Sequence, residues 1–145
     1  MIRVLVVEER RAVREGLKRL LAAAGEITVV GEAGGLGEAA EIAGRADCDL
    51  ALVGLSSSDP QTLEDVRRLT CTAPHLHVLV VGPNGDAALA DDALGHGASG
   101  YLDIGRARED LVKAVRLVCR GGVFTSAPES ERGRSSARVA YRDSQ

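Results

Sequence analysis

Hydrophobic residues along this chain follow two alternating patterns. Short apolar runs between polar or glycine-rich turns are typical of strands buried on both faces of a parallel sheet. Between these runs, apolar residues recur at the spacing of a helix with one buried face. The apolar runs predict strands at residues 2–7, 27–31, 50–55, 78–81 and 98–102. The helical spacing predicts helices at residues 13–24, 36–43, 60–69, 87–94 and 111–118.

The regular alternation of strand and helix predicts a three-layer α/β domain. Parallel strands joined through helices need right-handed crossovers, which place helices on both faces of one sheet. Among such folds we expect the flavodoxin-like (βα)5 fold with strand order 2-1-3-4-5. Chemistry in these sheets collects at the carboxyl ends of the central strands. The central run, residues 50–55, carries Gly54 near that end, a residue without a side chain.

Composition sets the outer limits of this domain. Residues 1–122 carry the alternating pattern, whereas residues 123–145 are rich in Ser, Arg and Glu and predict a linker or tail. Aromatic residues make up only 2% of the chain against 45% hydrophobic residues, so the core must consist mainly of Ala, Val, Leu and Ile. A formal charge of -3 argues against a nucleic-acid footprint over the whole domain.

The cysteines and the apolar runs bear on location. The three cysteines are far apart and odd in number, which fits neither zinc spacing nor a disulfide framework; they are Cys48, Cys71 and Cys119. Reduced thiols favour a cytoplasmic protein. No apolar run approaches the roughly 18 residues of a membrane span, so we expect no membrane partner.

Several separated segments resemble a known family. They are residues 1–9 (MIRVLVVEE), 13–17 (VREGL), 29–33 (VVGEA), 97–102 (GASGYL) and 120–122 (RGG). In this order and spacing the chain resembles the receiver domain of two-component response regulators. The most similar subgroup is the one whose receivers precede a LuxR/NarL-type helix-turn-helix. The resemblance covers roughly residues 1–122. It implies either a longer regulator whose helix-turn-helix output lies outside these 145 residues, or a receiver that acts alone as a protein-interaction module.

By this resemblance, three reactive groups of the family's phosphorylation site are missing. The phosphoacceptor aspartate matches Gly54, the phosphoryl-sensing Ser or Thr matches Gly82, and the phosphate-binding lysine matches Ile104. Phosphoryl transfer onto an aspartate needs a carboxylate nucleophile, a metal ion and positive charge on the phosphoryl oxygens. We therefore expect an atypical receiver with no catalytic residue and no enzymatic activity.

Two elements of the family's site persist. An acidic pair, Glu8 and Glu9, stands where the family binds Mg²⁺ through aspartates, and Tyr101 occupies the aromatic switch position. Hard cations need three or more oxygen ligands, so we expect a residual acidic rim with no metal and no cofactor. Without a hydroxyl at position 82, Tyr101 should hold one orientation beside the fourth helix. The predicted degenerate pocket comprises Glu8, Glu9, Gly54, Gly82, Tyr101 and Ile104.

Asp59 is the nearest acidic residue that could replace the missing acceptor. It lies five residues beyond Gly54 and directly before Pro60, which is typical of a helix start. An N-cap carboxylate is occupied by backbone N–H groups, so we expect Asp59 to cap a helix and not to accept phosphate.

The function implied is phosphorylation-independent signal transduction and transcriptional regulation through protein–protein contact. We expect a homodimer, or a heterodimer with another regulator, and DNA contact only through the output domain. The alternative is a small-molecule sensor with an uncharged or apolar ligand in the pocket vacated at positions 54, 82 and 104. The predicted dimer face lies on the first and last helices and includes Arg14, Lys18, Glu109, Val112 and Arg116. The face formed by the fourth helix, fifth strand and fifth helix is its main rival.

Overall fold

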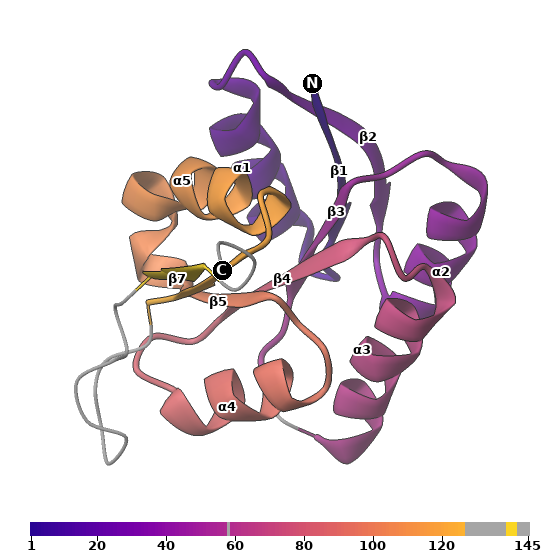
Figure 1. Ribbon diagram of the computed structural model, residues 1–145, viewed down its shortest axis with the longest axis vertical. Helices are drawn as coiled ribbons and strands as arrows, with labels where there is room; N and C mark the ends of the chain where they lie inside the picture. Colours follow the sequence, from indigo (N-terminus) through magenta and orange to yellow (C-terminus); the bar gives the residue numbers. More distant parts are fainter. Residues whose placement is uncertain (58, 127–138, 142–145) are drawn as a thin grey trace.

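The computed structural model describes residues 1–57, 59–126 and 139–141 as a single sheet covered by helices on both faces (Figure 1). The strands lie in the order β2-β1-β3-β4-β5-β6-β7. All neighbouring pairs are parallel except β6 and β7. The strands are β1 (Ile2–Val7), β2 (Ile27–Ala33), β3 (Leu50–Gly54), β4 (His77–Gly82), β5 (Gly100–Asp103), β6 (Gly122–Thr125) and β7 (Val139–Tyr141).

Five α-helices connect the parallel strands. Helices α1 and α5 pack together over one face of the sheet, and α2, α3 and α4 cover the other (Figure 1). The expected pairing of the first and last helices on one face is therefore confirmed. The helices are α1 (Arg11–Ala22), α2 (Leu36–Arg45), α3 (Pro60–Thr72), α4 (Ala87–Gly95) and α5 (Ala107–Cys119), with a short 3-10 turn η1 (Ile104–Arg106) before α5.

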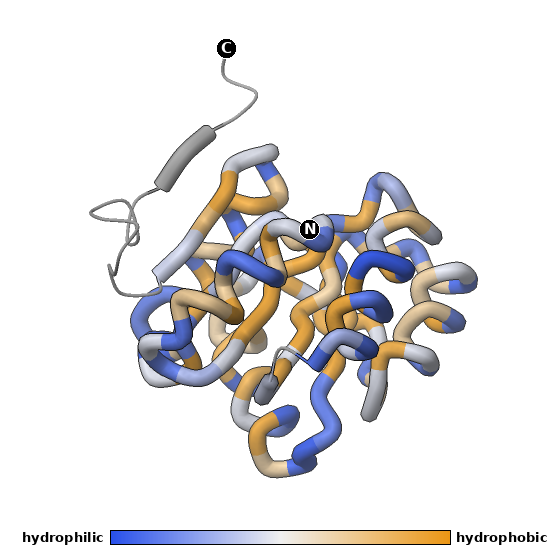
Figure 2. Tube along the Cα trace, turned by 90° about the horizontal axis from the view of Figure 1, so that it is seen from below, coloured by the Kyte–Doolittle hydropathy of each residue, from blue (hydrophilic) through white to orange (hydrophobic). Residues whose placement is uncertain are grey.

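The central strands supply both halves of the core because their side chains alternate between two covered faces. Along β3, Leu50 and Leu52 pack under α1 and α5, whereas Ala51 and Val53 pack under α2, α3 and α4. All four side chains are inaccessible to solvent. Figure 2 shows hydrophobic segments concentrated in the interior and hydrophilic segments along the outer turns. A sheet buried on both faces explains the continuous apolar runs in the sequence.

The prediction of five strands is wrong in number, although the order 2-1-3-4-5 is present in the sheet. Gly121 has a positive φ of 95° and turns the chain directly from α5 into β6. Phe124 then packs into the core under α5, and β6 pairs with β5 over two residues. The expected boundary at residue 122 therefore falls inside a strand. Residues 127–138 and 142–145 of the predicted tail lie outside the described residues.

Asp59 begins α3 as expected from the sequence. Its carboxylate accepts a hydrogen bond from the backbone N–H of Thr62 at 3.1 Å, and Pro60 occupies the first helical position. The cap satisfies one of the N–H groups that a helix start leaves without an intrahelical partner. In the part of the chain that the structure describes, no helix is long and apolar enough to cross a membrane.

The cap at Asp59 gives a direct test of the local fold. Asp59→Ala should lower the free energy of unfolding by about 1 kcal/mol, because the Thr62 N–H loses its acceptor. Asp59→Asn keeps a capping oxygen and should retain most of the stability. Urea denaturation of the three proteins measures the difference. Equal losses in both variants would show that the charge of Asp59 matters and that capping does not.

Candidate functional site

The carboxyl ends of β1, β3, β4 and β5 meet at one edge of the sheet. The register places Val7 beside Val53, Gly54 beside Val81 and Gly82 beside Asp103. Glu8 follows directly after β1 and Ile104 directly after β5. The six residues of the predicted pocket thus gather at the edge where doubly wound sheets place their sites.

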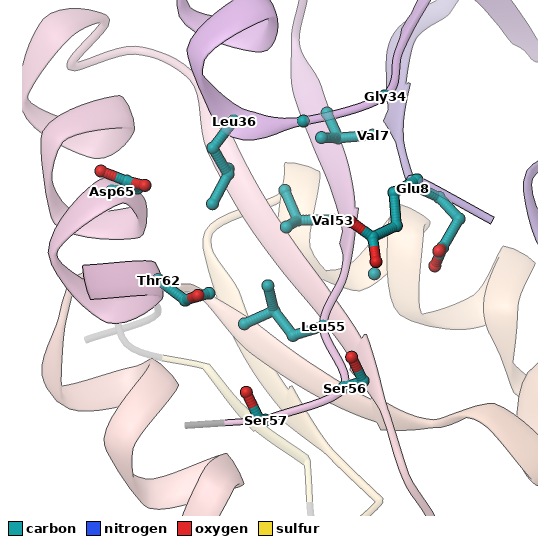
Figure 3. A pocket seen from close by; sticks show the side chains of 13 residues that line it. Val7, Glu8, Gly34, Leu36, Val53, Leu55, Ser56, Ser57, Thr62 and Asp65 are labelled. Atoms are coloured by element: carbon teal, nitrogen blue, oxygen red, sulfur yellow. The ribbon is translucent and has the colours of Figure 1, made fainter. Parts of the chain in front are cut away.

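The side chain of Glu8 occupies the space that a side chain at position 54 would need. A Cβ atom built on Gly54 would lie 2.0 Å from Glu8 Oε1 and 3.0 Å from its carboxyl carbon. Figure 3 shows the Glu8 carboxylate directed toward the end of β3, where Val53 and Leu55 flank the glycine. Glu8 is only 2% exposed. The glycine and the buried carboxylate therefore depend on each other sterically.

Arg10 neutralises this buried carboxylate. Its Nε donates to Glu8 Oε2 at 2.9 Å, its Nη2 donates to Oε1 at 3.1 Å, and its backbone N–H donates to Oε2 at 2.8 Å. This fork geometry is the strongest form of guanidinium–carboxylate pairing. The hydrogen bond to Glu8 raises the pKa of Arg10 above its ordinary value. This pairing is not apparent from the sequence pattern, although Glu8 is a longer acid than the aspartate usual in the family and Gly54 has no side chain to oppose it.

The backbone of Glu8 is fixed as firmly as its side chain. Its N–H donates to the Ala33 carbonyl at 2.9 Å, and its own carbonyl accepts from Arg14 Nη1 at 2.6 Å. These contacts tie the loop after β1 to the end of β2 and to the first turns of α1. The Glu8 carboxylate therefore projects from a loop held on both sides.

A second glycine makes room for Tyr101 in the same way. A Cβ atom at Gly82 would lie 2.4 Å from the Tyr101 hydroxyl oxygen and 2.9 Å from the ring carbon that bears it. The tyrosine is fully buried in the cluster that contains Leu89 of α4, and its hydroxyl donates to the Pro83 carbonyl at 2.9 Å. This is the placement beside the fourth helix expected for Tyr101.

The end of β5 carries two residues of opposite character. Ile104 is 37% exposed and faces outward at the start of η1. The preceding Asp103 is buried, and burial raises the pKa of its carboxyl group. Its backbone N–H donates to the Ser126 hydroxyl at 2.8 Å, while its Oδ1 has no partner among the described residues. Asp103 is not among the residues predicted from the sequence, because it lies between Tyr101 and Ile104, the two positions on β5 and η1 that match the family's site.

The vacated pocket expected across positions 54, 82 and 104 is not one open space. Glu8 fills the volume at Gly54, and Tyr101 fills the volume at Gly82. Two smaller cavities remain, and they share Leu55 and Ser56. One, of about 330 Å³, is lined by Glu8, Glu9 and the start of α2. The other, of about 230 Å³, is lined by Arg10, Gly82 and Ile104.

Metal-binding geometry is not found among the described residues. No group of three His, Cys, Asp or Glu side chains there is arranged to hold an ion. Both carboxylate oxygens of Glu8 already accept hydrogen bonds from Arg10. Glu9 is exposed and lines the larger cavity. The acidic pair predicted from the sequence is thus divided between a buried ion pair and a solvated rim.

The basic residues of the predicted interface pair with acids of their own chain. Arg14 and Lys18 both bind Glu32 of β2, at 3.1 and 2.8 Å. Arg116 of α5 pairs with Glu26. These hydrogen bonds lower the pKa of each glutamate below its ordinary value, chiefly through Lys18 and Arg116 respectively. Val112 is partly buried against the core, and Glu109 lines a groove between α1 and α5.

This fold and this edge of the sheet belong to a known class of signalling domain. The family model described as "Response regulator receiver domain" matches residues 4–116, and the chain belongs to that family. The transcriptional regulatory protein LnrK of Bacillus subtilis is 33% identical over 123 residues, which are 85% of this chain and 56% of that protein. The DNA-binding transcriptional activator DevR/DosR of Mycobacterium tuberculosis is 35% identical over 122 residues, 83% of this chain and 56% of that protein.

Solved structures agree with this assignment. The receiver domain of the putative response regulator NarL from Mycobacterium tuberculosis has a TM-score of 0.73 at 29% identity, covering 83% of this chain and 97% of that one. A receiver-containing structure of RcsB from Salmonella typhimurium reaches a TM-score of 0.77 at 21% identity, covering 94% of this chain and 70% of that one, which shows a shared fold. The chain spans a little over half the length of the curated relatives it matches.

The packing at Gly82 predicts the behaviour of Tyr101 in solution. Burial raises the pKa of the Tyr101 hydroxyl well above its ordinary value, and the carboxylates of Asp103 and Asp86 raise it further. Gly82→Ser should expel the ring toward solvent and move this pKa down toward its ordinary value. Ultraviolet titration of tyrosinate, with Tyr141→Phe in the background, isolates the signal because the chain has two tyrosines.

A control substitution separates this effect from a general response to added side chains. Gly16→Ser adds the same atoms on α1, where a Cβ meets nothing within 4 Å. It should leave the Tyr101 titration unchanged. An unaltered titration in Gly82→Ser as well would mean that the glycine does not determine where the ring lies.

Proposed function

We propose that this chain is an atypical receiver domain that works without phosphorylation and signals through protein–protein contact in the cytoplasm. It has no enzymatic activity, binds no cofactor and regulates transcription by way of an output domain joined to it. The observation that carries the proposal is the Glu8 carboxylate in the space above Gly54. The acceptor position lacks a nucleophile, and a neighbouring side chain fills the room that a nucleophile would need.

The remaining parts of the site support the same proposal. Phosphoryl transfer depends on positioned charge around the reacting oxygens. At position 104 an exposed isoleucine stands in place of the family's lysine, and the Arg10 guanidinium beside the site is bound to Glu8. Position 82 has no hydroxyl to bind a phosphoryl oxygen. A phospho-donor would meet neither a nucleophile nor an available cation here.

Transcriptional output is proposed from the relatives. Their names describe a transcriptional regulatory protein and a DNA-binding transcriptional activator, and this chain matches little more than half of each. The matched portion here is the receiver. We propose that DNA contact belongs to a helix-turn-helix domain outside these 145 residues, and that the receiver controls how such domains are paired.

A groove between α1 and the start of α5 favours a dimer on that face. Its volume is about 670 Å³, and Ile104 lies at its edge. Within the described chain, Ile104 and Met1 are the large hydrophobic residues that are exposed. Apolar lining residues are Val13, Leu17, Leu20 and Ala107. Because Arg14, Lys18 and Arg116 already pair within the chain, we propose that apolar contact around Ile104, and not intermolecular salt bridges, drives association.

The structure favours this dimer over the small-molecule sensor as the first proposal. A sensor needs an open pocket, and small-ligand sites usually occupy about 300–1,000 Å³. The cavity of about 330 Å³ beside Gly54 reaches that range, but Glu9 and Asp65 on its rim do not suit the uncharged or apolar ligand expected there. Ligand sensing remains the second candidate.

The first test of this proposal is exposure to a phospho-donor. Incubation with acetyl phosphate and Mg²⁺ should leave the intact mass unchanged, because the chain offers no carboxylate at position 54. A receiver that retains its aspartate serves as the positive control under the same conditions. A stoichiometric phospho-adduct on this chain would contradict the proposal.

Gly54→Asp extends this test. We expect the variant to remain unmodified, because the new side chain would collide with Glu8 and position 104 would still lack a cation. Efficient phosphorylation of this single variant would show that the surrounding residues had kept their catalytic competence.

The second test addresses the dimer. Sedimentation across micromolar concentrations should show self-association that Ile104→Glu weakens at least tenfold, since a charge would be desolvated at the apolar contact. Ala88→Glu, on the exposed side of α4, is the matched control and should have no effect. A monomer at every concentration would remove the dimer proposal. Disruption by Ala88→Glu alone would assign the interface to the rival face.

A further inference from the structure

We propose that the edge of the sheet contains an anion site and that the chain fills this site permanently with its own Glu8 carboxylate. The inference rests on the proposed function and explains how the site is stabilised without phosphate. The site consists of the Arg10 guanidinium, the Arg10 backbone N–H and the volume left free by Gly54. Glu8 is then an internal ligand, and not a remnant of metal binding.

The donors around the carboxylate are arranged as for a bound anion. Two side-chain nitrogens and one backbone N–H of Arg10 reach the two Glu8 oxygens within 3.1 Å. Arg10 is also the N-cap of α1, and neither the cap nor the first turn of that helix supplies an acidic side chain. The positive end of the helix dipole and its free N–H groups favour a negative charge there. Glu8 supplies that charge from just outside the helix.

The two partners of this ion pair differ in how deeply they are buried. The Glu8 side chain is 2% exposed, whereas Arg10 is 53% exposed and could remain solvated without its partner. A buried carboxylate without a counter-charge is strongly unfavourable. The asymmetry means that loss of Arg10 leaves a buried charge, while loss of Glu8 leaves an empty anion site beside a free guanidinium.

An empty site of this kind can be refilled from solution. We expect Glu8→Ala to lower Tm and to become sensitive to formate, the smallest carboxylate, because formate can bind Arg10 above Gly54. Its Tm should rise by about 3 °C or more in formate relative to chloride at equal ionic strength. The wild-type chain should not respond, since its site is already occupied.

The role of Arg10 is tested in the same assay. Glu8→Ala/Arg10→Ala should lose the formate response, and Arg10→Ala alone should be destabilised because Glu8 stays buried. Arg11→Ala removes a neighbouring exposed arginine and should leave both Tm and the formate response as in its parent. A formate response of equal size in all variants, or none in Glu8→Ala, would overturn the proposal.

A second pair of variants does not depend on how well Glu8→Ala folds. Gly54 has no positive φ, so alanine suits its backbone and would ordinarily stabilise the chain slightly. Here Gly54→Ala should lower Tm instead, because its Cβ meets Glu8 Oε1 at 2.0 Å. Adding Glu8→Asp, which withdraws the carboxylate by one methylene, should recover part of the loss. Gly37→Ala, where a Cβ meets nothing within 4 Å, is the control.

These outcomes are separable from those of the proposed function. If Gly54→Ala proves neutral and formate has no effect, the internal ligand is refuted even when acetyl phosphate leaves the wild-type chain unmodified. If acetyl phosphate does modify the wild-type chain, phosphorylation independence fails whatever formate does to Glu8→Ala.

Discussion

The contact between Glu8 and Arg10 determines how the carboxyl edge of this sheet is arranged. A carboxylate that is 2% exposed needs a counter-charge, and Arg10 provides three donors to it within 3.1 Å. The pair can form only because Gly54 leaves room beside it. Hydrogen bonds to Ala33 and Arg14 hold the backbone of Glu8, and they fix the point from which its carboxylate projects. The arrangement of the residues at this edge therefore follows from the need to neutralise the buried Glu8 carboxylate.

The second glycine shows the same principle without charge. Gly82 admits the ring of Tyr101, which buries its apolar surface under α4 and keeps a hydrogen-bond partner for its hydroxyl at Pro83. At both sites a glycine on one strand leaves a volume that a larger neighbouring side chain fills. Close packing explains why each of these glycines faces a large side chain, since an unfilled volume in an interior costs stability. At this edge of the sheet, the side chains of Glu8 and Tyr101 therefore fill the space beside the two glycines.

Charged residues on the face formed by α1 and α5 pair within the chain, and a groove lies beside them. Glu32 pairs with Arg14 and Lys18, and Glu26 pairs with Arg116, so these three cations of the α1 and α5 face are bound within the domain. Exposed ion pairs contribute little stability, but they remove charges from competition for a partner. What this face also offers is the groove beside Ile104, lined by apolar residues together with Arg19, Arg108 and Glu109. Ile104 contributes an exposed apolar side chain to that groove.

The sequence by itself determined the class of fold, the first five strands in their order and the start of α3 at Asp59. Those features depend on local periodicity, on capping chemistry and on matched motifs, all of which are written along the chain. Only the tertiary structure decided that Glu8 lies over Gly54, that Arg10 binds it, that Asp103 is buried and that β6 extends the sheet. Each of these depends on which side chains meet across strands that are distant in sequence, and a one-dimensional pattern does not specify those distances. Residues 8 and 54 are adjacent because two parallel strands pair in one register, and the space between them is a property of the folded sheet.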